Sequence, residues 1–135
     1  MIKVIAGPKG FGKTKAFIED INQAVAQAKG NVVCIEKSNR LMYDLDKSIR
    51  LIDTQEFELS KADVFAGFLY GIISQDFDIT NIFIESLNKI IPDKNEYEAV
   101  VEAAEKIGEK FNIDFTITVS AVLDDIPAGV KKYID

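Results

Sequence analysis

Apolar and polar residues follow two different spacings along the chain, one typical of buried strands and the other of amphipathic helices. Short apolar runs bounded by glycine or polar residues predict five strands, at residues 2–6, 31–36, 49–53, 82–84 and 115–120. Apolar residues three and four positions apart predict helices over residues 13–29, from about residue 60, from about residue 93, and after Pro127. Residues 39–48 show neither spacing cleanly, which is compatible with a loop or a short helix.

Strands and helices therefore alternate along the chain, which predicts βαβ units and a mostly parallel five-stranded sheet with helices on both faces. With 135 residues, we expect one domain spanning 1–135, with an α/β fold of three layers. Ligands of such sheets bind beyond the carboxyl ends of the strands. Glu36, Asp53, Glu85 and Ser120 each fall at a predicted strand end, so all four are expected on the same rim.

Short sequence signals predict where helices begin and end. Gly30 follows the first helical pattern and is a candidate for the glycine that terminates it. Ser60 and Asp63 resemble a helix start, with Asp in place of the Glu or Gln of a capping box. Asp93 and Glu96 have capping-box spacing just before the next helical pattern.

The first predicted strand leads into a glycine-rich segment that fits the pattern G-x-x-x-x-G-K-[ST], the phosphate-binding loop or Walker A motif. In this motif, backbone N–H groups and the start of the following helix surround a phosphate, and glycine permits the positive φ that the loop needs. Lys13 is expected to reach the β- and γ-phosphates, and the Thr14 hydroxyl to bind Mg²⁺. The candidate nucleotide-binding residues are Gly7, Pro8, Lys9, Gly10, Phe11, Gly12, Lys13, Thr14, Lys15 and Ser120.

A magnesium ion held with a nucleotide also needs an acidic residue at the end of a second strand. Glu85 follows an apolar run, as the acid of a Walker B strand does, and is our candidate together with Thr14. Asp53 ends another predicted strand and is the alternative. Lys13 and Glu85 are the candidate catalytic residues. Ser120 ends the last predicted strand, where its hydroxyl could touch the γ-phosphate or its attacking water.

The sequence specifies nucleotide binding better than it specifies nucleotide hydrolysis. P-loop ATPases often carry a second acid directly after the Walker B acid, and Ser86 occupies that position here. Transition-state charge also needs an arginine or an equivalent group, and the chain has only Arg40 and Arg50. Asn88 and Lys89 begin like the N-K-x-D guanine motif but lack its aspartate, so adenine is the default base.

Composition excludes several other classes of function. The net charge is −6 and no basic stripe is present, so binding to DNA or RNA is not expected. Cys34 is the one cysteine; it cannot form an internal disulfide and is expected to be a buried strand residue. The absence of histidine excludes Ser–His catalysis and a His-ligated metal. No signal peptide or membrane-length apolar run is found, so we expect a cytoplasmic protein without membrane contact.

The loop at residues 7–14, Glu85 and the strand–helix order together resemble a minimal P-loop NTPase of the additional-strand (RecA-like) group. The whole chain resembles small uncharacterised ATP-binding P-loop proteins of Gram-positive bacteria. This resemblance implies a P-loop NTPase fold in which the last strand separates the strand before the loop from the strand before Glu85. The loop sequence also resembles that of thymidine kinases, whose cysteine-rich zinc region one cysteine cannot supply.

Three functions fit these observations. The first is Mg²⁺-dependent binding of a nucleotide, with ATP as the default, and weak or partner-dependent hydrolysis. The second is a small-molecule kinase, whose acceptor pocket would come from Asn39, Arg40, Tyr43 and Asp53. The third is a non-enzymatic interaction module in which the bound nucleotide stabilises the fold or controls a partner, either another protein or a second copy in a homo-oligomer.

Overall fold

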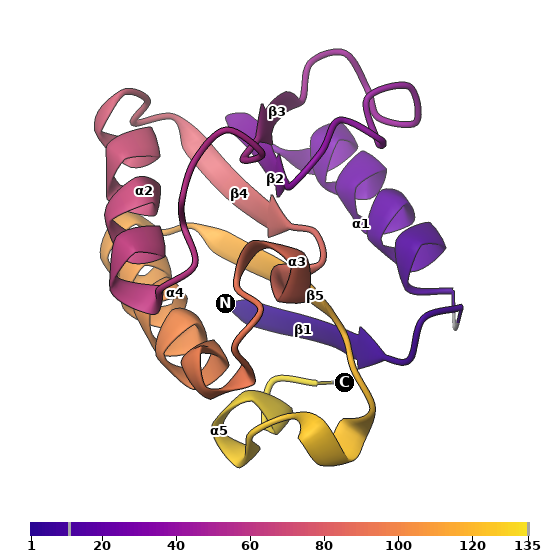
Figure 1. Ribbon diagram of the computed structural model, residues 1–135. Helices are drawn as coiled ribbons and strands as arrows, with labels where there is room; N and C mark the ends of the chain where they lie inside the picture. The colour runs from indigo at the N-terminus through magenta and orange to yellow at the C-terminus, as the bar shows by residue number, and fades with distance from the viewer. Residues whose placement is uncertain (11, 135) are drawn as a thin grey trace.

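A five-stranded sheet forms the centre of the computed structural model, which describes residues 1–10 and 12–134. All four pairings between neighbouring strands are parallel (Figure 1). The strands are β1 (Ile2–Gly7), β2 (Asn31–Glu36), β3 (Arg50–Asp53), β4 (Ile79–Ile84) and β5 (Asp114–Ser120). The predicted five-stranded sheet is confirmed, and its largest change in bounds is the earlier start of β4.

The strand order is β1-β5-β4-β2-β3. The last strand, β5, therefore lies between β1 and β4, as the resemblance implied, and β3 lies at one edge. The other edge is β1, where the amide of Val4 donates to the carbonyl of Tyr133 and Val4 forms an isolated parallel bridge with Ile134. This order places the end of β1 and the end of β4 on the same rim with one strand between them.

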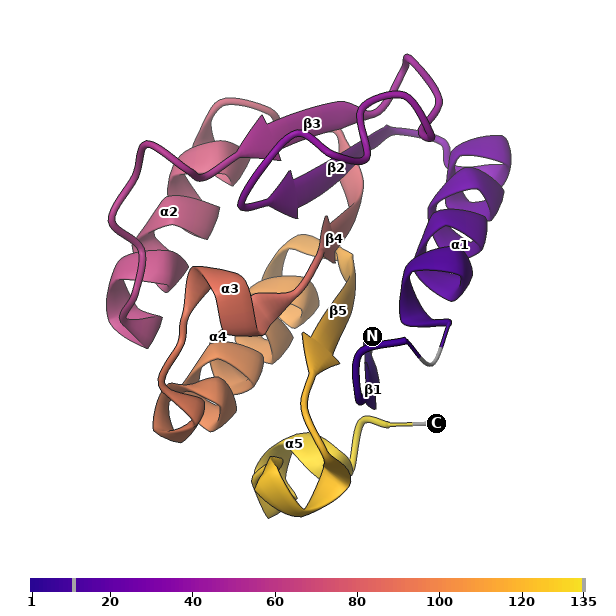
Figure 2. The same cartoon turned by 45° about the vertical axis from the view of Figure 1, so that its right-hand side comes forward.

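Helices cover both faces of the sheet, as predicted. Helix α1 packs on one face, whereas α2 and α4 pack side by side on the other (Figures 1 and 2). The helices are α1 (Lys13–Gln27), α2 (Ala62–Ser74), α3 (Leu87–Ile90), α4 (Tyr97–Phe111) and α5 (Ala128–Lys131), with 3₁₀ turns at Lys94–Glu96 and Leu123–Asp125. None of the helices in the described ranges has the length and apolar character needed to cross a bilayer.

Two apolar clusters fill the spaces between these layers. On the α1 face, Phe17 and Ile21 pack against the sheet through Cys34 and Phe83. Phe17 meets Phe83 edge to face, with the ring centroids 5.7 Å apart. Cys34 is fully buried, as predicted. The larger cluster lies on the other face, under α2 and α4. Phe17 thus ties the first turns of α1 to the sheet and holds the helix start beside the strand ends.

Residues 39–48 form successive turns, closed by hydrogen bonds from Met42 N to the Asn39 carbonyl and from Asp44 N to the Leu41 carbonyl. The loop reading is confirmed and the short-helix reading is wrong. Leu41 and Ile49 are buried against the α1-side cluster, which explains why isolated apolar residues interrupt an otherwise polar segment.

The start of α2 differs from the prediction. Lys61, not Ser60, is the N-cap residue, and the free amide of Ala62 is bound by the Glu96 carboxylate at 2.9 Å. Asp93 does cap the turn before α4, where it accepts a hydrogen bond from Asn95 N. The predicted capping box is therefore half formed, because Glu96 caps the neighbouring helix in place of its own.

Gly30 is also used differently from the prediction. It lacks the positive φ of a helix-terminating glycine, and the C-cap of α1 is Ala28 in an extended conformation. A Cβ atom at Gly30 would lie 2.0 Å from the Asp78 carbonyl oxygen. Glycine is required here because the chain before β4 passes directly over it.

Candidate functional site

Two described glycines of the glycine-rich segment have the positive φ that the motif requires. Gly10 and Gly12 have φ values of 93° and 79°, a region that residues with a side chain rarely adopt. Gly12 is the N-cap of α1, and within the described residues no side chain caps that helix start. The first turn of α1 also carries no acidic residue. Its N–H groups and its positive dipole end therefore remain available to an anion.

A pocket of about 520 Å³ opens at this rim, a volume within the usual range for small-molecule sites. It lies between the loop, the carboxyl ends of β4 and β5, and the segment that follows β2. The described residues that line it are Lys9, Gly10, Gly12, Lys13, Thr14, Phe17, Arg40, Glu85, Ser86, Asn88, Lys89, Thr118 and Ser120. Segments more than 100 positions apart in the sequence thus meet in one cavity.

Most of the predicted site residues reach this pocket. Those that line it are Lys9, Gly10, Gly12, Lys13, Thr14, Glu85 and Ser120. Gly7, Pro8 and Lys15 are not among the described lining residues; Gly7 is buried as the last residue of β1, and Lys15 is exposed on α1. Phe11 lies outside the described residues.

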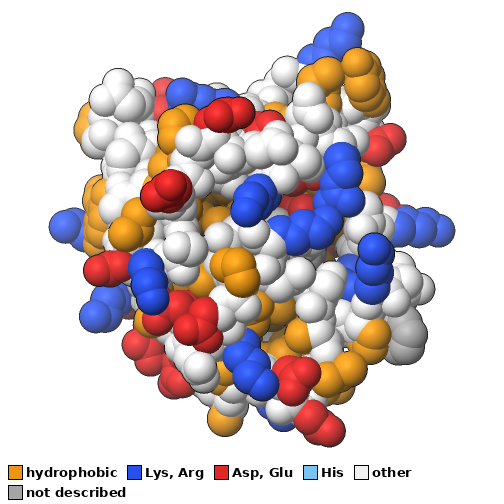
Figure 3. Space-filling model, viewed as in Figure 1, with side chains coloured by type: hydrophobic (Ala, Val, Ile, Leu, Met, Phe, Trp, Pro, Cys, Tyr) orange, Lys and Arg blue, Asp and Glu red, His pale blue; other side chains and the backbone are white. Residues whose placement is uncertain are grey.

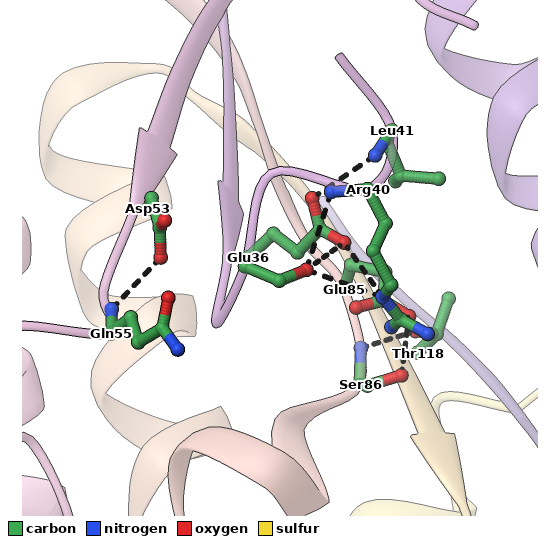
Figure 4. A network of polar contacts seen from close by, with 9 residues as sticks. Glu36, Arg40, Leu41, Asp53, Gln55, Glu85, Ser86 and Thr118 are labelled. Carbon is green, nitrogen blue, oxygen red and sulfur yellow. Dashed lines mark hydrogen bonds and ion pairs between the residues drawn. The ribbon is translucent and has the colours of Figure 1, made fainter. Parts of the chain in front are cut away.

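Asp53, the alternative metal ligand, lies elsewhere. It ends the edge strand β3, and its carboxylate accepts a hydrogen bond from Gln55 N at 2.9 Å. Figure 4 shows these two residues apart from the group around Glu85. Because β3 is separated from β4 by β2, Asp53 lies at the edge of the sheet and is not among the residues that line the pocket with Glu85.

The charge of the pocket is opposite to that of the whole chain. Lys9, Lys13, Arg40 and Lys89 line it, and Glu85 is the one acidic residue among the described lining residues. Figure 3 shows Lys and Arg side chains gathered around the hollow between α3 and the start of α1. In a chain of net charge −6, this local excess of cations favours an anionic ligand.

Lys13 points back into its own loop, where its ammonium group donates a hydrogen bond to the Pro8 carbonyl at 2.8 Å. Desolvation lowers the pKa of Lys13, while the nearby Glu85 carboxylate partly opposes that shift. In the ligand-free protein, the ammonium group has therefore lost part of its hydration, which disfavours its charged form. A phosphate would give the ammonium group a second negative partner in addition to the nearby Glu85 carboxylate.

Glu85 follows β4 and its side chain is almost fully buried, with 7% exposed. One carboxylate oxygen, Oε1, accepts a hydrogen bond from the Ser86 hydroxyl and lies 3.6 Å from Arg40 Nη2. The other, Oε2, is buried and has no hydrogen-bond partner among the described residues. A buried carboxylate oxygen without a partner is costly, and a metal ion or its water would satisfy it.

The donor set fits magnesium held jointly with a ligand. Within residues 1–10 and 12–134, no three Asp, Glu or Cys side chains are grouped so as to hold a metal by themselves. Magnesium keeps several waters and is commonly bound by one or two protein oxygens plus substrate phosphates. Glu85 and the Thr14 hydroxyl both line the pocket and are protein oxygens that suit this arrangement.

The segment after Glu85 is held by side chains from the neighbouring strand and helix. Ser86 has a left-handed φ of 48°, and its amide donates to the Thr118 hydroxyl at 2.7 Å. The Asn88 side chain accepts a hydrogen bond from Ser120 N at 2.9 Å. Ser86, Thr118 and Asn88 thus fix the position of Glu85 and of the β5 end relative to each other.

Sequence reasoning placed Glu36 on the rim and Arg40 in the acceptor pocket of a kinase, but predicted no contact of either residue with Glu85. Glu36 ends β2 beside β4 and is completely buried, and Arg40 reaches back from the following loop to both Glu36 and Glu85 (Figure 4). The usable signal was the acid at a strand end followed four residues later by one of only two arginines.

Comparison with known proteins gives no identification: neither a protein-family model nor a curated protein matches the chain.

Proposed function

We propose that this chain binds a magnesium–nucleotide complex and has a P-loop NTPase fold of the additional-strand kind. The observation that carries the proposal is the pocket in which the glycine loop faces Glu85 across β5, with one oxygen of that buried carboxylate unpaired. A strand end with an acid is common, but here the acid shares a cationic cavity with a phosphate-binding motif.

The phosphates would lie against the loop and the first turn of α1. Gly10 and Gly12 expose backbone N–H groups there without a Cβ atom, and Lys13 would exchange its hydrogen bond to the Pro8 carbonyl for one to the β- and γ-phosphates. Lys9 adds positive potential at the mouth of the pocket. Ser120, at the end of β5, is close enough to the cavity to contact the terminal phosphate or a water beside it.

Thr14 and Glu85 would hold Mg²⁺, with the remaining positions filled by phosphate oxygens and water. When bound, Mg²⁺ supplies positive charge that neutralises the β- and γ-phosphate oxygens. The chain's own contribution is the fixed position of the Glu85 carboxylate, which the Ser86 hydroxyl and the surrounding strand ends hold in place.

Hydrolysis is expected to be weak or to depend on a partner. Ser86 occupies the position of a second acid and donates its hydroxyl to Glu85, so it does not act as a base for water. Of the acceptor residues expected of a small-molecule kinase, only Arg40 lines the pocket; Tyr43 is 88% exposed and Asp53 lies farther along the rim. The kinase alternative therefore has no support from the geometry, whereas a nucleotide-regulated interaction module remains compatible with it.

Isothermal titration calorimetry with Mg–ATP, Mg–GTP and the corresponding diphosphates tests the proposal. We expect binding that requires Mg²⁺, weakens at least roughly tenfold in Lys13→Ala, and reveals the preferred base; tenfold corresponds to the low end of a hydrogen bond to a charged group. Lys106→Ala is the matched control, because Lys106 is an exposed lysine on α4, which packs on the opposite face from α1. Unchanged affinity in Lys13→Ala would refute the proposal.

A further inference from the structure

Arg40 forms a bridge between two acidic residues on neighbouring strands. Its Nε lies 3.2 Å from the Ser38 hydroxyl and 3.5 Å from Glu36 Oε1, and its Nη2 lies 3.6 Å from Glu85 Oε1. The side chain comes from the loop after β2 and lies along the wall of the pocket (Figure 4). It therefore sits beside the acid to which the metal has been assigned.

Arg40 is held more firmly at the Glu36 end of this bridge than at the Glu85 end. Glu36 is completely buried, and its carboxylate accepts hydrogen bonds from the Ser38 hydroxyl at 2.7 Å and from Leu41 N at 3.4 Å. The side chain of Arg40 is 58% exposed, and the contact with Glu85 is a single long one. Because Arg40 is more than half exposed and its one contact with Glu85 is long, this contact contributes little, so the guanidinium can leave Glu85 while its Nε stays with Ser38 and Glu36.

The direction in which Arg40 points identifies what it would meet. The lysine of a phosphate-binding loop reaches the β- and γ-phosphates, and an acid in the position of Glu85 serves the same two groups. Arg40 lies against Glu85, so the nearest part of a bound nucleotide is its terminal phosphate. A planar guanidinium with several N–H donors is well suited to phosphate oxygens.

Building on the proposed function, we infer that Arg40 distinguishes a nucleoside triphosphate from a diphosphate by binding the terminal phosphate. In the ligand-free protein the guanidinium is paired with Glu85. When the Glu85 carboxylate serves the metal, the guanidinium turns to the γ-phosphate. A diphosphate offers no group at that place, so Arg40 adds affinity for the triphosphate alone.

The inference has a structural consequence for the loop of residues 37–49. Arg40 is followed by Leu41, which is buried against the α1-side cluster, and then by the exposed Met42 and Tyr43. A shift of Arg40 toward a γ-phosphate would therefore act on a segment with two exposed apolar side chains. Nucleotide state would be communicated to that surface.

The test measures dissociation constants for Mg–ADP and for a magnesium complex of a non-hydrolysable ATP analogue, in wild type, Arg40→Ala, Arg40→Lys and Arg50→Ala. Arg50 is the matched control because it is the other arginine, is similarly exposed, and pairs with Asp76 outside the pocket. Arg40→Ala should bind the triphosphate about tenfold or more weakly while Mg–ADP binding changes little, since hydrogen bonds to charged groups contribute about this much. The triphosphate affinity of Arg40→Lys should lie between the affinities of Arg40→Ala and wild type.

An unchanged triphosphate-to-diphosphate ratio in Arg40→Ala would overturn the inference and leave the proposed function standing. Equal weakening of both nucleotides would also overturn it, because Arg40 would then act on the whole site. Failure of the wild-type protein to bind either nucleotide would overturn the inference together with the proposed function. Each variant's ligand-free melting temperature reports whether it folds, independently of these ratios.

Discussion

Neutralising Glu85 tests whether its carboxylate binds a metal ion or stabilises the fold. In Glu85→Gln, the side chain keeps its shape and its contact with the Ser86 hydroxyl. The buried oxygen without a partner is replaced by the NH₂ of a neutral amide, which costs less to leave unpaired than a charged carboxylate oxygen. The ligand-free protein should therefore not depend on this charge for its stability.

The magnitude follows from the neighbours of the carboxylate. An unpaired buried polar group costs about 1–3 kcal/mol, and a charged one more, so neutralisation recovers on the order of 1 kcal/mol. Against this stands the attraction to the exposed Arg40, which contributes up to about 1 kcal/mol. The two effects nearly cancel. With about 2.1 cal/mol/K of unfolding entropy per residue over 135 residues, 1 kcal/mol corresponds to roughly 3–4 °C.

Differential scanning fluorimetry measures both outcomes in one series. The melting temperature of ligand-free Glu85→Gln should stay within about 4 °C of wild type, while the Mg²⁺-dependent part of the stabilisation by ATP is lost. Glu102→Gln, an exposed carboxylate on α4, is the control. Removal of one partner of a buried ion pair costs about 3–5 kcal/mol, which would lower the melting temperature by more than roughly 10 °C. Such a drop, or an intact Mg²⁺ dependence, would refute the reasoning.

Three further predictions test other parts of the account. Because desolvation lowers the pKa of Lys13 and phosphates bind its protonated form, Mg–ATP affinity should fall with rising pH before the ordinary lysine pKa of 10.5 is reached; titrations between about pH 8 and 10 check this, and constant affinity would contradict it. Burial raises the pKa of the Cys34 thiol, so the unfolded chain loses its proton first and stability should fall above about pH 8.5, by up to about 1.4 kcal/mol per pH unit. Urea unfolding of Cys34→Ala should lack this contribution to the slope. Gly30→Ala should destabilise by about 1–3 kcal/mol or more, because its Cβ would meet the Asp78 carbonyl. Gly67→Ala, an exposed helix position with no described atom near the new Cβ, should instead stabilise by up to about 1 kcal/mol, and equal effects of the two changes would contradict the geometry.

The sequence predicts the strands well because each is a short apolar run with polar or glycine boundaries. It also predicts positive φ at glycines of the motif, as found at Gly10 and Gly12, because this is a local property of the motif. Helix starts are harder, because their partners come from distant segments. The amide at the start of α2 is bound by Glu96, which lies 34 positions later, and no local pattern contains that information.

The candidate site likewise contains residues that a local pattern marks and residues whose place depends on the fold. Lys13 and Glu85 were found because a motif and a strand end mark them. Asp53 has the same local pattern as Glu85 but lies two strands farther along the sheet, and only the strand order separates them. The contact of Arg40 with Glu85 was not predicted, because Arg40 lies in a segment without periodic pattern, whose path is set by the buried Glu36 and Leu41.

The most direct test of the central claim is a titration of ¹⁵N-labelled protein with Mg–ATP, followed through backbone amide resonances. The account predicts that the largest shifts arise from Gly10, Gly12, Lys13 and Thr14, with smaller ones at Ser86 and Ser120, because these groups surround the proposed phosphate position. The amides of α4, on the opposite face of the sheet, should not move. Shifts confined to another surface, or none at saturating Mg–ATP, would contradict the assignment of this pocket as a nucleotide site.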